Sequence, residues 1–283
     1  MKLQERASQL GKRQKQLGYK MNIEVLISTM NEKSIDCYKR FNLKTDALII
    51  NQTDHNAYEE ISVDGNKIRM ISTDTRGLGV SRNLALLNSN ADIVVFCDND
   101  EVFEDDYDKI ILSDFTKHPD VDFFVFKTII YQDGKEIIKV KEEKNLSIYN
   151  SLRYGSVHFA FKRESQRRKN IWISTYFGAG TNNGSGEDSI FISDCLRNGM
   201  KVRTSENLIA RIYNDDSTWF KGFDRKFFYD KGKLSKALFP KTYKLYIEQF
   251  LRRHKEMTKD INIKTARKLM LDGAKDFGGE NGK

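Results

Sequence analysis

Two carboxylates suited to binding a metal ion follow a short apolar run in the first half of the chain. Residues 92–97, Asp-Ile-Val-Val-Phe-Cys, have the length of one buried strand, and Asp98 and Asp100 come directly after them. Residues i and i+2 of an extended chain point the same way, so the two carboxylates face one ligand if the extended geometry continues. Hard divalent cations prefer such oxygens and complete their coordination with phosphate and water. The pair indicates a metal and diphosphate site, and the alternative is a solvated acidic loop, because five further acids follow by position 108.

A second acidic pair, Glu187 and Asp188, opens a helical segment further along the chain. Apolar residues within 187–197 recur at helical spacing, and Asn198-Gly199 is typical of a helix end. A Gly-rich stretch, residues 177–186, comes just before the pair. One interpretation is a reactive pair at a helix start. The other is that both acids only stabilise the first turn, where negative charge is favoured.

The elements that must position these acids alternate between strand and helix. Segments rich in Ile, Val or Leu predict strands at 22–29, 47–51 and 67–73, with helices predicted at 34–43 and 80–87. After Asp100 the sequence predicts a helix over 105–116, a strand over 122–130, a turn at 131–134 that opens a hairpin into 136–141, and an irregular basic stretch over 145–170. This alternation favours an α/β fold with a parallel sheet.

The composition is that of a globular protein with basic ends. Of 283 residues, 39% are apolar, which suffices for a sizeable core. No apolar run approaches the roughly 20 residues that cross a bilayer, and residues 1–20 lack the apolar centre of a signal peptide. Three widely separated cysteines indicate neither a disulfide framework nor a zinc cluster. These features predict a cytoplasmic protein.

The charge divides the chain into three parts. Residues 1–20 form a basic leader and residues 221–283 a basic, helical extension, whereas the domain between them, 21–220, is acidic overall. An acidic centre is unlike a nucleic-acid groove, so no specific nucleic acid is expected as a partner. A homo-oligomer is compatible with the sequence.

Four motifs in a fixed order give residues 21–220 a resemblance to a known family. They are polar residues after the first predicted strand (Thr29, Asn31, Glu32), Arg76-Gly-Leu-Gly-Val-Ser-Arg-Asn83, the Asp98/Asp100 pair, and Gly186-Glu-Asp188 with Phe177-Gly-Ala-Gly180 just before it. Together they resemble the family 2 glycosyltransferases, particularly the bacterial enzymes that build capsule and other surface polysaccharides. The resemblance implies the GT-A fold, in which helices flank a Rossmann-like, mostly parallel sheet, with the helical extension added at the carboxyl end.

The resemblance also implies a donor half, 21–130, that binds a nucleotide sugar, most commonly one of uridine diphosphate. Asn51 stands where relatives often carry Asp, and the Arg82 guanidinium would contact the base or the diphosphate. The alternative is that Gly77-Leu-Gly79 is only a tight turn and Arg82 an ordinary surface arginine. The implied donor-binding residues are Thr29, Asn31, Glu32, Asn51, Arg82, Asp98 and Asn99.

Inverting displacement is the reaction that the resemblance implies. A carboxylate takes the proton of the acceptor hydroxyl, while a divalent cation, Mn²⁺ or Mg²⁺, stabilises the departing nucleoside diphosphate. Asp188 suits the role of base, and Glu187 would orient a loop or bind an acceptor hydroxyl and raise the proton affinity of Asp188. Asp98 and Asp100 are the implied metal ligands. Many members add a histidine after the Gly-Glu-Asp helix, but residues 210–219 contain none. Either Asp215 or Asp216 substitutes for it, or Asp100 and the substrate phosphates hold the cation.

The acceptor half, 131–220, would bind a hydroxyl of a glycan or of a polyprenyl-diphosphate-linked acceptor. The basic segment 162–170 precedes the Gly-rich stretch, so its arginines are expected to meet an acceptor diphosphate, although a solvated loop fits equally well. The candidate acceptor residues are Phe177, Gly178, Ala179, Gly180, Arg168 and His158. Residues 221–283 either rest on an anionic membrane, making the protein peripheral at the inner face of the cell membrane, or cap the main domain.

Two other functions remain open from the sequence. A sugar nucleotidyltransferase also uses an α/β nucleotide site, but it carries a Gly-rich triphosphate loop after the first strand, where this chain reads Ser28-Thr-Met-Asn-Glu32. A non-catalytic nucleotide-sugar-binding assembly partner would keep the donor site without needing Asp188.

Overall fold

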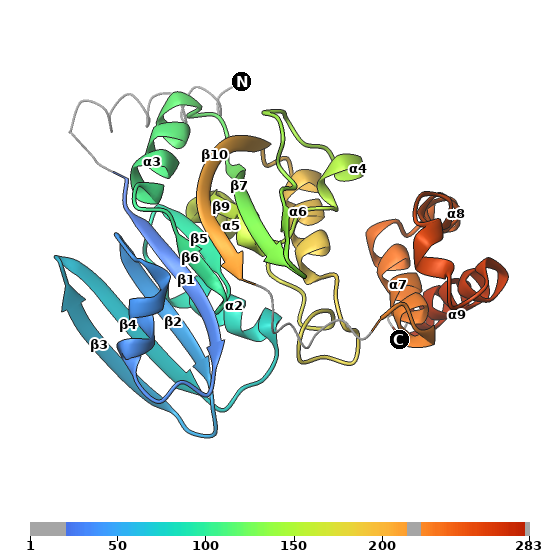
Figure 1. Cartoon of the computed structure of the whole chain (residues 1–283), viewed down its shortest axis with the longest axis horizontal. Helices are drawn as coiled ribbons and strands as arrows, with labels where there is room; N and C mark the ends of the chain where they lie inside the picture. The colour runs from blue at the N-terminus through green and yellow to red at the C-terminus, as the bar shows by residue number, and fades with distance from the viewer. Residues whose placement is uncertain (1–20, 214–221, 281–283) are drawn as a thin grey trace.

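The computed structural model describes residues 21–213 and 222–280 of the chain. A central sheet is flanked by helices, and three C-terminal helices gather at one side of it (Figure 1). The predicted basic leader, residues 1–20, and the proposed ligands Asp215 and Asp216 lie outside the described residues. The α/β fold with its central sheet is confirmed.

Within the described residues, ten strands form one sheet in the order β3-β4-β2-β1-β5-β9-β7-β10-β6, with β8 paired to β7 outside this path. The strands are β1 (Ile23–Met30), β2 (Asp46–Gln52), β3 (Ala57–Val63), β4 (Asn66–Thr73), β5 (Ile93–Cys97), β6 (Glu101–Phe103), β7 (Phe123–Gln132), β8 (Lys135–Ile137), β9 (Phe159–Lys162) and β10 (Val202–Tyr213).

The sheet is mixed, and the parallel pairing that the sequence predicts is found among its central strands. The ladders β1–β2, β1–β5, β2–β4 and β7–β10 are parallel. The others are antiparallel, among them the edge hairpin β3–β4 and the inserted β9, which pairs with both β5 and β7. Strand β9 runs opposite to both neighbours, so β5 and β7 run in the same direction, and the carboxyl ends of β1, β2, β5, β7 and β10 share one edge.

Helices and 3-10 turns lie on both faces of the sheet and, at the C-terminal end of the described chain, beside it. They are η1 (Ile35–Phe41), α2 (Leu78–Asn88), α3 (Tyr107–Lys117), α4 (Ile148–Ser151), η2 (Ser156–His158), α5 (Arg163–Arg168), α6 (Glu187–Arg197), α7 (Arg225–Leu238), α8 (Tyr243–Arg253), η3 (Lys255–Thr258) and α9 (Ile263–Glu280).

Alternating apolar side chains of the central strands build one core on each face. In β1, Val25 and Ile27 pack toward η1 and α3, whereas Leu26 packs toward α2 and α6. All five residues of β5 are buried, because helices cover both faces of this strand. A strand that is covered on both faces needs a continuous apolar run, as β5 has. The acids that follow β5 therefore lie at the edge of the sheet.

The stretch 145–170, predicted to be irregular, contains α4, η2, β9 and α5. These elements are short, and Phe159–Lys162 has only four residues in its strand, so no periodicity reveals them. Strand β10 is equally hidden, because its run is interrupted by polar residues at a β-bulge near Ser205 and Leu208.

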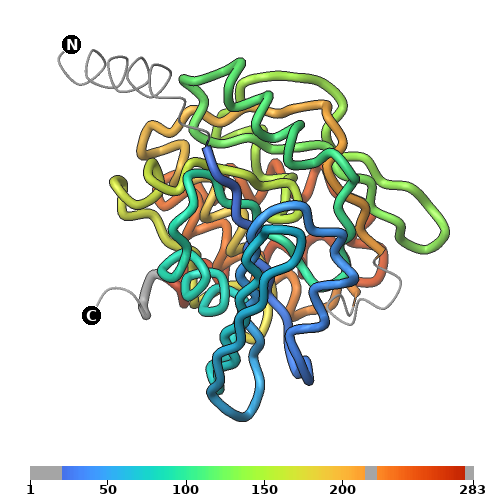
Figure 2. The backbone as a smooth tube through the Cα atoms, turned by 90° about the vertical axis from the view of Figure 1, so that its left-hand side faces the viewer, coloured from blue at the N-terminus to red at the C-terminus, as the bar shows by residue number. Residues whose placement is uncertain are grey.

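The three C-terminal helices have a core of their own and also pack on the rest of the chain. Asp224 caps α7 by accepting a hydrogen bond from the Phe227 backbone N at 2.7 Å. Leu234 and Leu238 of α7 pack against Phe177 of the Gly-rich stretch. Figure 2, viewed from the β3–β4 hairpin, shows these helices behind the sheet. None of the helices among the described residues is long and apolar enough to span a bilayer.

Candidate active site

Three segments bring charged residues to the carboxyl edge of the sheet. Asp98 follows β5, Arg82 belongs to α2, and Glu187 and Asp188 are the first residues of α6. The edge lies at the carboxyl ends of parallel strands, which is where open α/β sheets bind ligands. The structure thus brings together the two acidic pairs and the arginine that the sequence singled out separately.

A single guanidinium joins these acids. Arg82 Nη2 donates to Asp98 Oδ1 and Arg82 Nη1 to Asp188 Oδ1, each at 2.8 Å. Glu187 Oε1 lies 3.7 Å from Arg82 Nη1, and Ser156 Oγ also accepts from Nη2. We call Arg82, Asp98, Glu187 and Asp188 the Arg82 cluster.

Arg82 is 1% exposed, and its guanidinium lies 5.4 Å from the centre of the Phe96 ring. Burial opposes its charge, but Asp98, Asp188 and Glu187 outweigh burial and hold the pKa of Arg82 above its usual value. Both terminal nitrogens are occupied by protein groups, unlike those of an ordinary surface arginine. These contacts favour a role in positioning carboxylates over the predicted direct contact with the base or diphosphate.

The two acids of α6 hold their protons more strongly than ordinary carboxyl groups. Burial is the largest cause for both; it raises the pKa of Glu187 to about 7, with the Asp188 charge adding to it and Arg82 opposing it. The pKa of Asp188 is raised by burial against the effect of Arg82. Asp188 Oδ2 accepts a hydrogen bond from the Ser156 backbone N at 3.1 Å, so both of its oxygens are held in place.

The Gly-rich stretch fits tightly around the Arg82 cluster. A Cβ on Gly178, which has φ +104°, would lie 2.7 Å from Glu187 Cδ. Gly180 lies against Gly77, and the Leu78 backbone N donates to the Ala179 carbonyl O at 2.9 Å, so the stretch also meets the start of α2. Phe177 is buried against α7. The buried ring of Phe177 contradicts its predicted contact with an acceptor.

The acids after β5 form a turn instead of the continued strand on which their shared orientation was predicted. Strand β5 ends at Cys97, and the chain turns through Asn99 and Asp100 into β6. Asn99 is exposed at the tip. Burial, followed by the charge of Asp98, raises the pKa of Asp100 to about 6. Asp100 forms no ion pair within residues 21–213 and 222–280.

The residues at this turn fit a divalent cation. Asp100 is a carboxylate with raised proton affinity and no basic partner among the described residues. Glu101, buried beside it, has an Oε1 atom without a hydrogen-bond partner among the residues that the structure describes. In the described parts of the chain, no three His, Cys, Asp or Glu side chains are grouped as a complete metal site. A cation at this turn would therefore need oxygens from the substrate.

The predicted nucleoside-binding residues form a connected polar network at the ends of β1 and β2. Thr29 Oγ1 donates to Glu32 Oε1 at 3.0 Å, and Arg40 of η1 donates to both residues. Asn51 is fully buried and exchanges hydrogen bonds with the Glu32 backbone. Asn31 is exposed, with φ 57°. Asn51 thus supports the loop that carries Glu32, and the exposed surface belongs to Asn31 and Glu32.

Two residues that were predicted to bind the acceptor, Arg168 and His158, lie where they cannot contact it. Lys162 pairs with Ile93 at the amino end of β5, so α5 and Arg168 lie at the sheet edge opposite Asp98. Arg168 is also ion-paired with Glu164 at 2.6 Å. His158 is fully buried; its Nδ1 lies 2.9 Å from both Thr128 Oγ1 and the Phe126 carbonyl O, and burial lowers its pKa to about 3. Both acceptor predictions are corrected by these positions.

Sequence reasoning missed three further residues at the site. Ser156 holds Asp188 and Arg82, Arg40 binds Glu32, and the charge of Lys139 acts on Asp188. Burial lowers the pKa of Lys139, with Asp188 opposing it. None of the three belongs to a motif, so only the folded chain shows their positions. The hairpin β7–β8 leads directly to Lys139, which is the one signal that could have suggested it.

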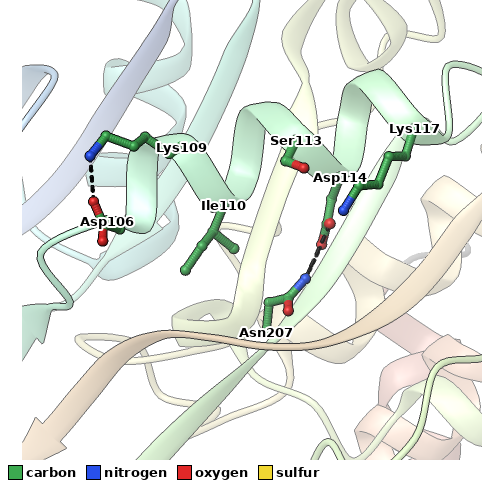
Figure 3. A pocket seen from close by; sticks show the side chains of 7 residues that line it. All are labelled: Asp106, Lys109, Ile110, Ser113, Asp114, Lys117 and Asn207. Atoms are coloured by element: carbon green, nitrogen blue, oxygen red, sulfur yellow. Dashed lines mark hydrogen bonds and ion pairs between the residues drawn. The ribbon is translucent and has the colours of Figure 1, made fainter.

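A hollow of about 410 Å³ lies away from this edge, on α3 (Figure 3). Asp114 is the buried group there, and it accepts hydrogen bonds from Ser205 Oγ at 2.6 Å and from Asn207 Nδ2. These bonds hold the β10 bulge against α3. The hollow has a structural explanation and carries no part of the candidate site.

Comparisons with known proteins give a matching family model and similar solved structures. Residues 48–185 match the model of a family described as Glycosyl transferase family 2. The crystal structure of S. aureus TarS 1–349 in complex with UDP-GlcNAc is 14% identical, with a TM-score of 0.64, over 91% of this chain and 80% of that one. The structure of TarS 1–349 gives 14% and 0.62 over the same shares, and its UDP complex 15% and 0.59 over 85% of this chain and 74% of that one. No curated protein matches the sequence. The structural likeness confirms the expected GT-A fold.

Proposed function

We propose that the chain is a glycosyltransferase that moves a sugar with inversion from a nucleoside-diphosphate donor to an acceptor hydroxyl; the match of residues 48–185 to the family described as Glycosyl transferase family 2 supports this. The observation that carries this proposal is the Arg82 cluster. One guanidinium fixes Asp188, the proposed base, and Asp98, the proposed donor-side acid, at 2.8 Å each. Arg82 would then orient both the base that activates the acceptor hydroxyl and the acid on the side of the leaving diphosphate.

Asp188 takes the proton of the attacking hydroxyl in this proposal. A general base must accept hydrogen bonds at a fixed place, and Arg82 and the Ser156 backbone N orient the two oxygens of Asp188. Its raised pKa, caused first by burial, makes it a stronger base than an exposed aspartate. Glu187 orients the Gly-rich stretch, since Gly178 lies directly against its carboxyl group.

We place the donor diphosphate at the turn after β5. Asp98 and Asp100 would hold a divalent cation, Mn²⁺ or Mg²⁺, with Asn99 facing the donor. When bound, such a cation offsets the negative charge of the departing diphosphate. The raised pKa of Asp100 and the unpartnered Glu101 Oε1 support this assignment. Asn31, Glu32 and the neighbouring Thr29 would meet the nucleoside.

A uridine diphosphate sugar is the donor that we propose. The support is the likeness to TarS, whose solved structures include complexes with UDP-GlcNAc and with UDP. A sugar nucleotidyltransferase is disfavoured, because the first strand is followed by Asn31 with φ 57° and the η1 turn instead of a Gly-rich triphosphate loop.

For the acceptor, we propose a hydroxyl of a glycan or of a polyprenyl-linked intermediate in surface polysaccharide synthesis. In the same proposal, residues 21–220 form the catalytic domain. Its donor half is 21–130 and its acceptor half is 131–220. A cytoplasmic enzyme would reach such an acceptor at the inner face of the membrane. Exposed basic residues on α8 and the turn before it, among them Lys241, Lys244 and Arg252, support a contact with anionic lipid, beside an exposed Leu245.

Vesicle pelleting tests the membrane contact. Replacing Lys241, Lys244 and Arg252 by Glu should abolish pelleting with vesicles that contain anionic lipid. Neither the wild-type protein nor this variant should pellet with neutral vesicles. Pelleting that survives the reversal would contradict the contact.

A binding panel tests the donor assignment. Nucleoside diphosphates and nucleotide sugars are titrated into the protein with and without Mn²⁺, followed by an assay of donor consumption. The proposal expects tight, metal-dependent binding of a uridine diphosphate compound and consumption that Asp188→Asn abolishes without loss of binding. Consumption that survives this substitution contradicts the role of Asp188.

A further inference from the structure

Two tyrosine rings stack at the carboxyl edge of the sheet. Tyr131 lies near the end of β7 and Tyr213 ends β10, and the two residues are direct partners in the parallel ladder. Their ring centroids are 5.3 Å apart and their planes differ by 11°. The strands β7 and β10 run side by side in Figure 1. The pair therefore sits on paired backbone and not on a loose loop.

The neighbouring side chains hold one ring and leave the other accessible. Arg211 Nη1 donates to the Tyr131 hydroxyl at 2.7 Å, and Arg211 Nε donates to Glu104 Oε1 at 2.7 Å. Tyr213 is 51% exposed, and among the described residues its hydroxyl has no hydrogen-bond partner. One ring is thus anchored, and the second presents apolar surface to a ligand.

The ring pair lies beside the proposed donor site. The Tyr213 backbone N donates to the Asp100 carbonyl O at 3.0 Å, directly after the antiparallel pairing of Ile212 with Glu101. The predicted nucleoside residues Thr29 and Asn51 end β1 and β2, on the other side of β5. The tyrosines therefore extend the site away from the nucleoside, toward the half of the sheet formed by β7 and β10.

We propose that Tyr131 and Tyr213 form a subsite for a pyranose ring of the acceptor. The proposal rests on the proposed function. The C–H groups on one face of a pyranose make it apolar, and the negative face of an aromatic ring attracts such polarised hydrogens. A stacked, anchored pair loses little conformational entropy when a ligand binds.

Ligand-observed saturation-transfer NMR tests the subsite. The probes are the methyl glycosides of glucose, galactose and N-acetylglucosamine, added with UDP and Mn²⁺. At least one should bind to the wild-type protein, Tyr213→Phe should keep its affinity within about twofold, and Tyr213→Ala should weaken it about tenfold, the loss of roughly one stacking contact. Tyr58→Ala, at an exposed tyrosine of β3, is the matched control and should change nothing.

Calorimetry on the same variants separates the possible failures. Lack of UDP binding by the wild-type protein contradicts the proposed function and the subsite with it. UDP binding together with glycoside binding that is absent, or indifferent to Tyr213→Ala, overturns the subsite alone. If Tyr213→Ala weakens UDP-GlcNAc but not UDP, the rings serve the donor sugar, and the assignment to the acceptor is wrong.

Discussion

The start of α6 and the turn after β5 are both acidic and share one edge of the sheet, but their charges are balanced in different ways. Asp188 lies 2.8 Å from the buried Arg82 guanidinium and accepts from the Ser156 backbone. Asp100 has no ion pair within the described residues, and its pKa is raised to about 6 by burial and by Asp98. The first region contains a cation supplied by the protein, Arg82, whereas the second contains none among the described residues, which is what the proposed ligand site requires.

This difference indicates a division of labour. A carboxylate that is paired inside the protein has a fixed orientation before substrate arrives, which suits a base. A half-buried carboxylate without a cationic partner gains most from a bound cation, which suits a ligand-binding turn. Asp98 belongs to both regions, since it binds Arg82 and raises the pKa of Asp100. A cation bound at the turn would therefore act on Arg82 through Asp98.

The substitution Asp188→Asn should have the largest effect on catalysis and the smallest on binding. The amide keeps the shape and part of the hydrogen bonding but cannot take a proton, so donor consumption should fall by about 10²–10⁴-fold. The affinity for the nucleotide should stay within about twofold, since the turn after β5 is untouched. Steady-state rates and calorimetry on one preparation measure both. If rate and affinity fell equally, the start of α6 and the turn after β5 would not have separate roles in catalysis and binding.

Replacing Arg82 by Met should disturb both regions at once. Breaking a buried ion pair costs about 3–5 kcal/mol, and we expect about 2 kcal/mol here because Asp98 and Asp188 are partly in contact with solvent. Loss of orientation should lower the rate about 100-fold, and Asp188 should titrate at higher pH. Urea unfolding and the pH dependence of the rate measure these effects.

Arg69→Met provides the control for that substitution. Arg69 is also mostly buried and pairs with Glu24 at 2.6 Å, but it lies in β4, away from the α6 start. It should lower stability while leaving the pH dependence of the rate unchanged. A shifted pH dependence in Arg69→Met as well would show that destabilisation alone explains the Arg82 result.

Asp100→Asn should weaken metal-dependent nucleotide binding about 10–100-fold, as losses at metal-binding positions do. The measurement is a calorimetric titration of UDP at fixed Mn²⁺. Asp105→Asn is the matched control, since Asp105 is an exposed acid of the same stretch that bonds Asn42. If the two variants bound UDP with the same affinity, the assignment of the cation to the turn after β5 would be wrong.

Gly178→Ala should damage the α6 start more than a comparable change elsewhere. Its Cβ would lie 2.7 Å from Glu187, so we expect a loss of about 1–3 kcal/mol of stability from overpacking, together with a reduced rate. Gly134 also has a positive φ, +69°, but an added Cβ there meets nothing within 4 Å. Gly134→Ala should thus show only the backbone penalty. Thermal unfolding of the pair should differ accordingly, and equal shifts would refute the close packing.

The smallest expected effect is the pH dependence of metal-nucleotide affinity. Asp100 must lose its proton to bind a cation, and its raised pKa of about 6 keeps it protonated below that pH. Affinity should therefore rise with pH and level off above about 7, with a loss of about tenfold at pH 5. Calorimetry at several pH values measures this, and Asp100→Asn should flatten the curve. A flat wild-type curve would contradict the assignment of Asp100.

The sequence predicted the elements whose patterns are local. The apolar run before Asp98 gave β5, and the helical spacing after Glu187 gave α6, each within two residues of its observed limits. It missed β9 and β10, because Phe159–Lys162 is too short for a period and a bulge interrupts Val202–Tyr213. The antiparallel insertion of β9 between β5 and β7 is a long-range pairing that no local pattern contains.

The site was predictable in its residue types but not in its contacts. The motifs singled out Arg82, Asp98 and Asp188, yet only the folded chain shows one guanidinium between the two acids. His158 and Arg168 were assigned from their place in the sequence, which does not reveal that one is buried and the other lies at the opposite edge. Ser156 contacts Asp188 through its backbone N and Arg82 through its side-chain Oγ, but it belongs to no motif, so its place in the sequence carried no signal.

A calorimetric titration of UDP into the wild-type protein, with and without Mn²⁺, tests the central claim most directly. If the turn after β5 is left for a ligand and its cation, binding should require Mn²⁺ and should weaken at least about tenfold when the metal is chelated. Binding of equal strength without metal, or no binding of UDP under either condition, would contradict the account.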